Sequence, residues 1–273
     1  MCRSTAPTRT KVRRPEAAYR LLAGVALASM APMRALACAI LFLTRIPLPR
    51  MSLDARDIAE SAGYFAWVGL LIAALLGLAS VAALPLFGAR LGALVVVALW
   101  VAVTGGLHLD GLADAIDGLS GGRGERERTL AIMRDSRIGS HGAVALLLVV
   151  LLKWAALERA LPLASGWLMA PVAARYAATL LIARFPYARA AGLGSPFVGA
   201  DHRRALVIGA GAPLLAAVVL GPWSLGLLLV ALIGALLVAL RMARLLGGLT
   251  GDVYGAAIEV AEVCALLLAP ALH

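Results

Sequence analysis

The chain has 273 residues, of which 62% are hydrophobic and only 15% charged, and its formal net charge is +10. A soluble domain is about half apolar and a quarter charged, so this composition excludes an ordinary soluble protein. The positive charge does not indicate a nucleic-acid partner, because the sequence offers no soluble domain and no interleaving of aromatic and basic residues. The three cysteines are scattered and lack C-x-x-C spacing, which argues against a disulfide framework and a structural zinc site.

The N-terminal part of the chain is basic and differs from the rest. Residues 1–33 are predicted to be a disordered basic extension, followed by a short amphipathic or re-entrant helix around Arg34 to Thr44. A signal peptide is disfavoured, because Pro32 and Arg34 interrupt the first apolar segment and no cleavage site precedes a soluble domain. Residues 34–273 are expected to form one membrane-embedded domain.

Beyond this region, apolar segments recur at close to the roughly 20 residues that cross a bilayer as a helix. The pattern predicts an all-α, polytopic integral membrane bundle of about seven transmembrane helices. The expected spans are residues 62–84, 91–107, 142–161, 164–184, 205–221, 223–240 and 255–271.

The basic residues indicate how the bundle is oriented. With seven spans, the N-terminal region and the segments 108–141, 185–204 and 241–254 share one side, and they hold 20 of the 25 lysines and arginines. The other side receives only Arg90 and Arg159. Because an excess of Lys and Arg marks cytoplasmic loops, those four segments are expected in the cytoplasm.

An acidic motif follows the second span. The sequence "GGLHLDGLADAIDG" places Asp110, Asp114 and Asp117 at i, i+4 and i+7, which is one face of an α-helix about 10 Å long. Like charges at this spacing repel, and Mg²⁺, which takes one or two carboxylates together with water and phosphate oxygens, would compensate them. Two such ions would activate a phosphate for attack. The alternatives are a solvated acidic helix end and a zinc site that uses His108.

A polar segment, "RDSRIGSHG", precedes the third span. It contains Arg134, Asp135, Ser136, Arg137 and His141, and we expect these residues to bind substrate phosphate. Arginines suit bidentate phosphate binding, and a segment that opens a helix offers free N–H groups to an anion. The alternative is a basic anchor that contacts lipid headgroups. The nearby "GGRGERERT" lacks the Gly-Lys-Ser/Thr ending of a P-loop, which excludes a P-loop NTPase.

The last span brings a second acidic group, Asp252, Glu259 and Glu262, after the glycine-rich "GGLTG". Carboxylates within a span are costly unless they are paired or face a polar cavity. As functional groups, Asp252 and Glu259 would join the aspartates of the earlier motif in one metal site, so the seventh span should pack beside the second or third. As structural groups, the two glutamates would pair with Arg175 or Lys153.

Several of these motifs occur together in one known family. "FLTRIPLP", "GGLHLDGLADAIDG", "IMRDSRIGSHGAVAL", "GLGSPF" and "GGLTGDVYGAAIEVAE" resemble, in order, the cobalamin 5′-phosphate synthases, or adenosylcobinamide-GDP ribazoletransferases. The resemblance covers the chain from about residue 36 to its end. Asp110, Gly111 and Ala113 are also similar to the start of the CDP-alcohol phosphotransferase motif, although Asp114 replaces its arginine and the spacing is compressed.

The resemblance implies a function and a set of site residues. It implies transfer of α-ribazole or its 5′-phosphate onto adenosylcobinamide-GDP with release of GMP, in a bacterial inner membrane and with magnesium as cofactor. Further partners would be membrane lipid, a second copy of the chain and other cobalamin-assembly enzymes. Carried over by motif, the metal ligands are Asp110, Asp114, Asp117, Asp252 and Glu259, with Asp135 among the phosphate residues. The catalytic residues are Asp114, His108 and Asp117, with Asp117 as the general base.

Two other functions share part of the pattern. A CDP-alcohol phosphatidyltransferase of lipid synthesis would use the same metal chemistry on a CDP-lipid and release CMP. An ion-coupled transporter would use intramembrane Glu259 and Glu262, but it should carry its acids at mid-bilayer, whereas most acids here gather near one face.

Overall fold

The structure, a computed structural model, describes residues 31–163, 165–190, 192 and 194–271. Within these residues the secondary structure is helical, and the only β-type pairing is an isolated bridge between Tyr187 and Leu249. The predicted disorder of the N-terminal extension falls mainly on residues 1–30, which lie outside the described part. Residues 31–33 belong to a helix, Ala31–Leu43, which begins three residues before the predicted start near Arg34.

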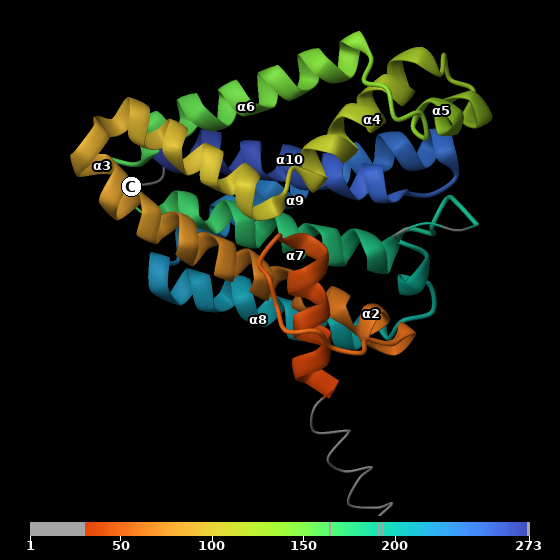
Figure 1. Ribbon diagram of the computed structural model, residues 1–273, viewed down its shortest axis with the longest axis horizontal. Coiled ribbons are helices and arrows are strands. Elements are labelled where there is room, and N and C mark those ends of the chain that lie inside the picture. The colour runs from red at the N-terminus through yellow and green to blue at the C-terminus, as the bar shows by residue number, and fades with distance from the viewer. Residues whose placement is uncertain (1–30, 164, 191, 193, 272–273) are drawn as a thin grey trace, which may run out of the picture.

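Within the described residues, six helical segments are long and apolar enough to cross a membrane, and the first of them folds back on itself. It includes α3, Phe65–Thr104, whose Gly88 has φ 69° and ψ 176° and breaks the helix. A straight helix of this length would measure about 60 Å, twice the apolar thickness of a bilayer. A Cβ on Gly92 would lie 3.3 Å from the Ala83 carbonyl oxygen, so the two arms pack together as a hairpin (Figure 1). Counted as two arms, this segment brings the candidate crossings to the seven that the sequence predicted.

The other five crossings follow the predicted order with ends that shift by a few residues. They are α6 (Ser140–Ala160), α7 (Met169–Arg184), α8 (His202–Leu220), α9 (Ser224–Leu246) and α10 (Gly251–Leu268).

Shorter helices connect these crossings. The segment predicted as a long polar loop contains α4 (Leu107–Gly121) and α5 (Arg126–Ile132), and α2 (Ala55–Ser61) precedes α3. Single 3₁₀ turns occupy Ala62–Tyr64, Gly166–Leu168, Ser195–Phe197 and Ala269–Ala271.

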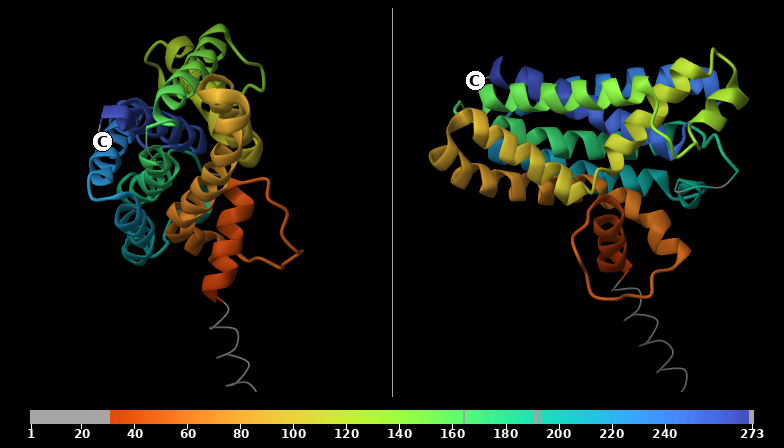
Figure 2. Two further views of the ribbon diagram at one scale, coloured as in Figure 1. Left: turned by 90° about the vertical axis from the view of Figure 1, so that its left-hand side faces the viewer. Right: turned by 45° about the horizontal axis from the view of Figure 1, so that its top comes forward.

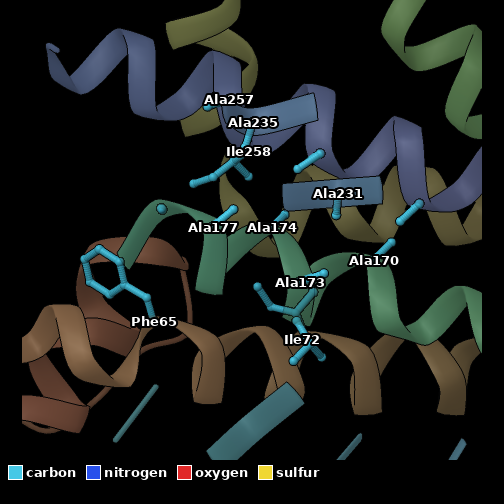
Figure 3. Packing of buried hydrophobic residues seen from close by; sticks show 14 of the residues in the cluster. Phe65, Ile72, Ala170, Ala173, Ala174, Ala177, Ala231, Ala235, Ala257 and Ile258 are labelled. Carbon is cyan, nitrogen blue, oxygen red and sulfur yellow. The ribbon is translucent and has the colours of Figure 1, made fainter. Parts of the chain in front are cut away.

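Helix α7 lies at the centre of the bundle, and its sequence is rich in alanine. Figure 3 shows Ala173 beside Ile72 of α3, and Ala177 facing Ala235 of α9 and Ile258 of α10. These side chains are almost fully buried. Small residues let helix backbones approach closely, which is the main source of attraction between helices in a lipid environment. The alanines therefore allow one helix to pack against several neighbours.

The polar connections gather at one end of the bundle, and the Gly88 turn lies at the other (Figure 1). The Ala188 N–H donates to the Leu249 carbonyl at 2.8 Å, which joins the α7–α8 connection to the α9–α10 turn. The Arg126 guanidinium of α5 donates to the Leu246 carbonyl at 2.8 Å. Three segments that are distant in sequence are thus held side by side.

The helix Ala31–Leu43 projects from the side of the bundle beside α2 (Figure 2). Its Ala35, Ala39 and Leu43 are buried. The Arg34 guanidinium donates to both carboxylate oxygens of Asp57, with Nε at 3.1 Å from each. This ion pair fixes the N-terminal helix to α2.

Candidate active site

The three aspartates of the first acidic motif lie on α4, as the spacing predicted. Thr104 ends α3, and Gly105 and Gly106, with φ of 65° and 72°, turn the chain before α4 begins at Leu107. Glycine adopts this left-handed backbone without steric cost. The new helix direction leaves Asp114 and Asp117 half-buried against neighbouring elements, while Asp110 stays exposed.

Helices α4 and α10 cross where two glycines meet. A Cβ on Gly111 would lie 2.9 Å from the Asp252 carbonyl oxygen, and one on Gly255 would lie 3.2 Å from the His108 carbonyl oxygen. Any larger residue would push the helices apart. The crossing therefore brings Asp252 beside the aspartates of α4, and it confirms that the two acidic segments of the sequence lie together.

The carboxylates are close enough to perturb one another. Burial, followed by the negative charges of Asp110, Asp252 and Asp117, raises the pKa of Asp114 to about 6, against a smaller opposing effect of Arg189. A carboxylate with a raised pKa holds its proton to a higher pH than an isolated aspartate. The repulsion that the sequence predicted is therefore present between residues of α4 and α10.

Asp117 has a structural partner that the sequence did not reveal. Its Oδ2 accepts from the Gly139 N–H at 2.7 Å, and its Oδ1 accepts from the Gly142 N–H at 2.8 Å. These are free N–H groups at the N-terminus of α6, so Asp117 caps that helix from α4. Both carboxylate oxygens are engaged, which disfavours the predicted role of Asp117 as general base. We regard Asp114 as the better candidate.

The segment "RDSRIGSH" runs along the surface into α6, close to Asp117. Arg137 Nη2 lies 2.6 Å from Asp135 Oδ2, and this pairing lowers the pKa of Asp135 to about 2. Arg134, Ser136 and His141 are exposed. Asp135 thus holds one of the two arginines expected to bind phosphate, while Arg134 is open to solvent. The predicted phosphate-binding role of the segment stays a prediction.

Glu259 and Glu262 form ion pairs with Lys153 and Arg175, which is the structural role considered for them from the sequence. Lys153 Nζ lies 2.6 Å from Glu259 Oε2 and also pairs with Glu262, which forms a second ion pair with Arg175. All four side chains are buried. Glu259 is thus paired with Lys153, and its predicted role as a metal ligand stays a prediction. These four residues, called the buried charge cluster below, join α6, α7 and α10.

His108 connects this cluster to the acidic residues. Arg175 Nη2 lies 3.3 Å from His108 Nδ1, and His108 Nε2 is buried without a hydrogen-bond partner. Burial and the positive charges of Arg175 and Lys153 hold the pKa of His108 well below its usual range. The neutral ring lines a pocket that also contains Asp110 and Asp252.

This pocket, called the acid pocket below, encloses about 660 Å³, including the part that opens to solvent. Its other wall is aromatic, because Phe42, Phe65 and Phe197 pack with ring centroids 5.6 to 5.9 Å apart. Phe42 belongs to the "FLTRIPLP" motif and Phe197 to "GLGSPF". The pocket thus brings together four of the motifs that the sequence resemblance rests on.

Arg189 was missed by sequence reasoning, although it lies in one of the basic segments. Its Nη2 is 2.8 Å from Asp252 Oδ2, and only 12% of its side chain is exposed. Nothing in the local sequence pairs Arg189 with Asp252, since the residues are more than sixty positions apart. The only sequence feature that could have indicated a role for Arg189 is its position between the motifs "RDSRIGSHG" and "GLGSPF".

The chemistry of the site suits a hard divalent cation. Asp110 and Asp252 face the same pocket, and Mg²⁺ needs only one or two protein carboxylates beside water and phosphate oxygens. Among the described residues, no three His, Cys, Asp or Glu side chains converge on one point closely enough to hold a metal by themselves. Burial and the neighbouring carboxylates together raise the pKa of Asp114 to about 6, and Arg189 offsets only part of this effect.

The fold and the site define a polytopic, all-helical membrane protein with an acid-lined pocket at one end of its bundle. Residues 35–270 match the family described as cobalamin-5-phosphate synthase. The chain is 40% identical over 235 residues to an adenosylcobinamide-GDP ribazoletransferase of Escherichia coli O17:K52:H18, covering 83% of this chain and 95% of that protein. It is 40% identical over 248 residues to the enzyme of the same name from Desulfitobacterium hafniense, covering 87% and 97%.

The chain therefore belongs to the cobalamin-5-phosphate synthase family. No solved structure matches it.

Proposed function

We propose that this protein transfers α-ribazole or its 5′-phosphate onto adenosylcobinamide-GDP, which completes the nucleotide loop of cobalamin. The curated relatives carry this activity in their name and match the chain over almost their full length. The structural observation that supports the proposal is the crossing of α4 and α10. At this crossing, Asp110 and Asp252, which belong to two different sequence motifs, line one pocket.

The proposed reaction breaks the pyrophosphate of adenosylcobinamide-GDP. The acceptor hydroxyl attacks the phosphorus attached to cobinamide, GMP leaves, and the hydroxyl proton passes to a carboxylate. Asp114 suits this proton transfer, because a pKa of about 6 is closer to the working pH than that of an ordinary aspartate. Asp110 and Asp252 would hold magnesium, which neutralises charge on the pyrophosphate and on the departing GMP. Because Arg175 can only donate to Nδ1, neutral His108 carries its proton on Nε2 and would donate a hydrogen bond from there.

The experiment that tests the function is a search for the released nucleotide. The purified protein in lipid nanodiscs is incubated with adenosylcobinamide-GDP, α-ribazole and magnesium, and GMP is measured by chromatography. We expect GMP that depends on all three components, and none when EDTA replaces magnesium. A parallel reaction with a CDP-lipid and an alcohol acceptor tests the alternative phosphatidyltransferase. Release of CMP there, without GMP in the first reaction, would contradict the proposal.

The acid pocket is proposed to face the cytoplasm of a bacterial inner membrane. The support is the uneven distribution of basic residues, since 20 of 25 belong to the N-terminal region and to connections on one side. On a cysteine-free background, Glu125→Cys and Val198→Cys should react with a membrane-impermeant maleimide only in inverted vesicles. Pro222→Cys, at the opposite end, should react only in intact spheroplasts. Labelling of Glu125→Cys and Val198→Cys from different sides would contradict this topology.

A further inference from the structure

The connection between α7 and α8 is held rigidly enough to present a charged side chain. Besides the Ala188–Leu249 bond, the Leu249 N–H donates to the Pro186 carbonyl at 2.9 Å. Arg126 Nη2 donates to the Ala188 carbonyl at 3.0 Å. These contacts fix the backbone immediately before Arg189 against the turn that begins α10. The position of the Arg189 guanidinium is therefore set by non-local contacts.

The guanidinium itself is incompletely satisfied. Its Nη2 lies 2.8 Å from Asp252 Oδ2, but its Nε is buried without a hydrogen-bond partner. A buried donor without a partner is destabilising, and more so when it is charged. A guanidinium gains most from two parallel hydrogen bonds to one oxyanion. The ion pair with Asp252 therefore does not use all the N–H donors of the Arg189 guanidinium, and a further acceptor could bind them.

Arg189 also lines a second pocket beside the acid pocket. This space encloses about 1000 Å³, including its open part, and its lining includes Ser195 and His202. The two pockets share four lining residues, namely Ile182, Gly194, Phe197 and Tyr254. Arg189 therefore lies at the boundary between the carboxylates and an open space large enough for part of a substrate.

We propose that Arg189 is the phosphate-binding residue of this site, and that its pair with Asp252 is a resting contact which substrate phosphate replaces. When a phosphate takes the guanidinium, Asp252 loses its cationic partner and becomes free to bind a divalent cation at the adjoining pocket. Substrate binding and completion of the carboxylate site are then one event. The proposal rests on the proposed function, because that function supplies the phosphate ligands.

The first test measures phosphate binding without metal or turnover. The full-length protein in nanodiscs with EDTA is titrated calorimetrically with inorganic pyrophosphate and with GDP. Arg189→Gln should weaken binding roughly 10- to 100-fold, as expected for lost hydrogen bonds to a charged group, and Arg189→Lys should retain part of it. Arg184→Gln is the matched control, because this exposed arginine lies on the same side of the bundle and lines a different, apolar groove; it should bind as wild type.

A second variant separates ligand binding from a structural role. Asp252→Asn removes the resting partner of Arg189, so it should tighten metal-free pyrophosphate binding, in the opposite direction to Arg189→Gln. If the pair only fixes the α7–α8 connection, both variants should weaken binding alike. That result, or unchanged binding in Arg189→Gln, or no metal-free binding by the wild type, would overturn the proposal.

Kinetics then identify which substrate supplies the phosphate. If Arg189 holds the donor pyrophosphate, Arg189→Gln should raise KM for adenosylcobinamide-GDP with either acceptor. If it holds the acceptor phosphate, the KM for α-ribazole 5′-phosphate should rise and that for α-ribazole should not. A wild-type protein that binds pyrophosphate but releases no GMP would contradict the proposed function and leave the assignment of Arg189 intact.

Discussion

Asp114→Asn should reduce turnover on the order of 10³-fold while the protein still inserts and folds. The substitution keeps the size of the side chain but removes a charge that three neighbouring aspartates already make costly. A site that acts on a pyrophosphate depends on charged groups that are already in place. Loss of one such group typically lowers the rate on the order of 10²- to 10³-fold. The rate of GMP release under single-turnover conditions measures the effect.

The same experiment tests whether the two acidic segments act as one unit. Asp252→Asn should also be severely impaired, and the Asp114→Asn/Asp252→Asn double variant should be little worse than either single variant, since residues that act as one catalytic unit are strongly non-additive. Glu127→Gln on the exposed face of α5 is the control and should keep wild-type turnover. Rate losses that multiply, with unchanged magnesium dependence in Asp252→Asn, would place Asp252 outside the metal site.

Glu262→Gln should lower the free energy of unfolding by about 3–5 kcal/mol, the cost of removing one partner from a buried ion pair. Glu262 pairs with both Arg175 and Lys153, and all three side chains are buried. Without its charge, two buried cations would share Glu259 alone. Unfolding in mixed micelles, followed by tryptophan fluorescence, measures the loss.

A compensating variant makes this result specific. Glu262→Gln combined with Lys153→Met should recover part of the lost stability, because Arg175 is then the only cation opposite Glu259. Glu158→Gln, on α6 but outside the buried charge cluster, should change stability by less than about 1 kcal/mol. A similar small effect of Glu262→Gln would mean that the cluster contributes little to the fold.

The membrane fold and the acidic helix were predictable because their signals are local. The length of each apolar segment predicts a membrane crossing. The two arms of α3 were predicted as separate spans because each arm is an apolar segment of its own. The spacing of Asp110 and Asp114 put both on one face of α4, since helical periodicity acts over four residues. The packing of α10 beside the acidic motif was also predicted, but the close approach is made by Gly111 and Gly255, whereas Gly248 of "GGLTG" approaches Pro186.

The partner of each charge was decided by tertiary structure. Asp117 caps α6, and Glu259 pairs with Lys153, although the local sequence suited both residues to a metal site. Arg189 reaches Asp252 only because backbone bonds to Leu249 hold its segment at the start of α10. Periodicity reports the face on which a side chain lies, but an ion pair depends on which elements the packing brings within about 4 Å. The sequence by itself therefore determined where the acids are, and the packing of α4, α6 and α10 decided which of them remain free for chemistry.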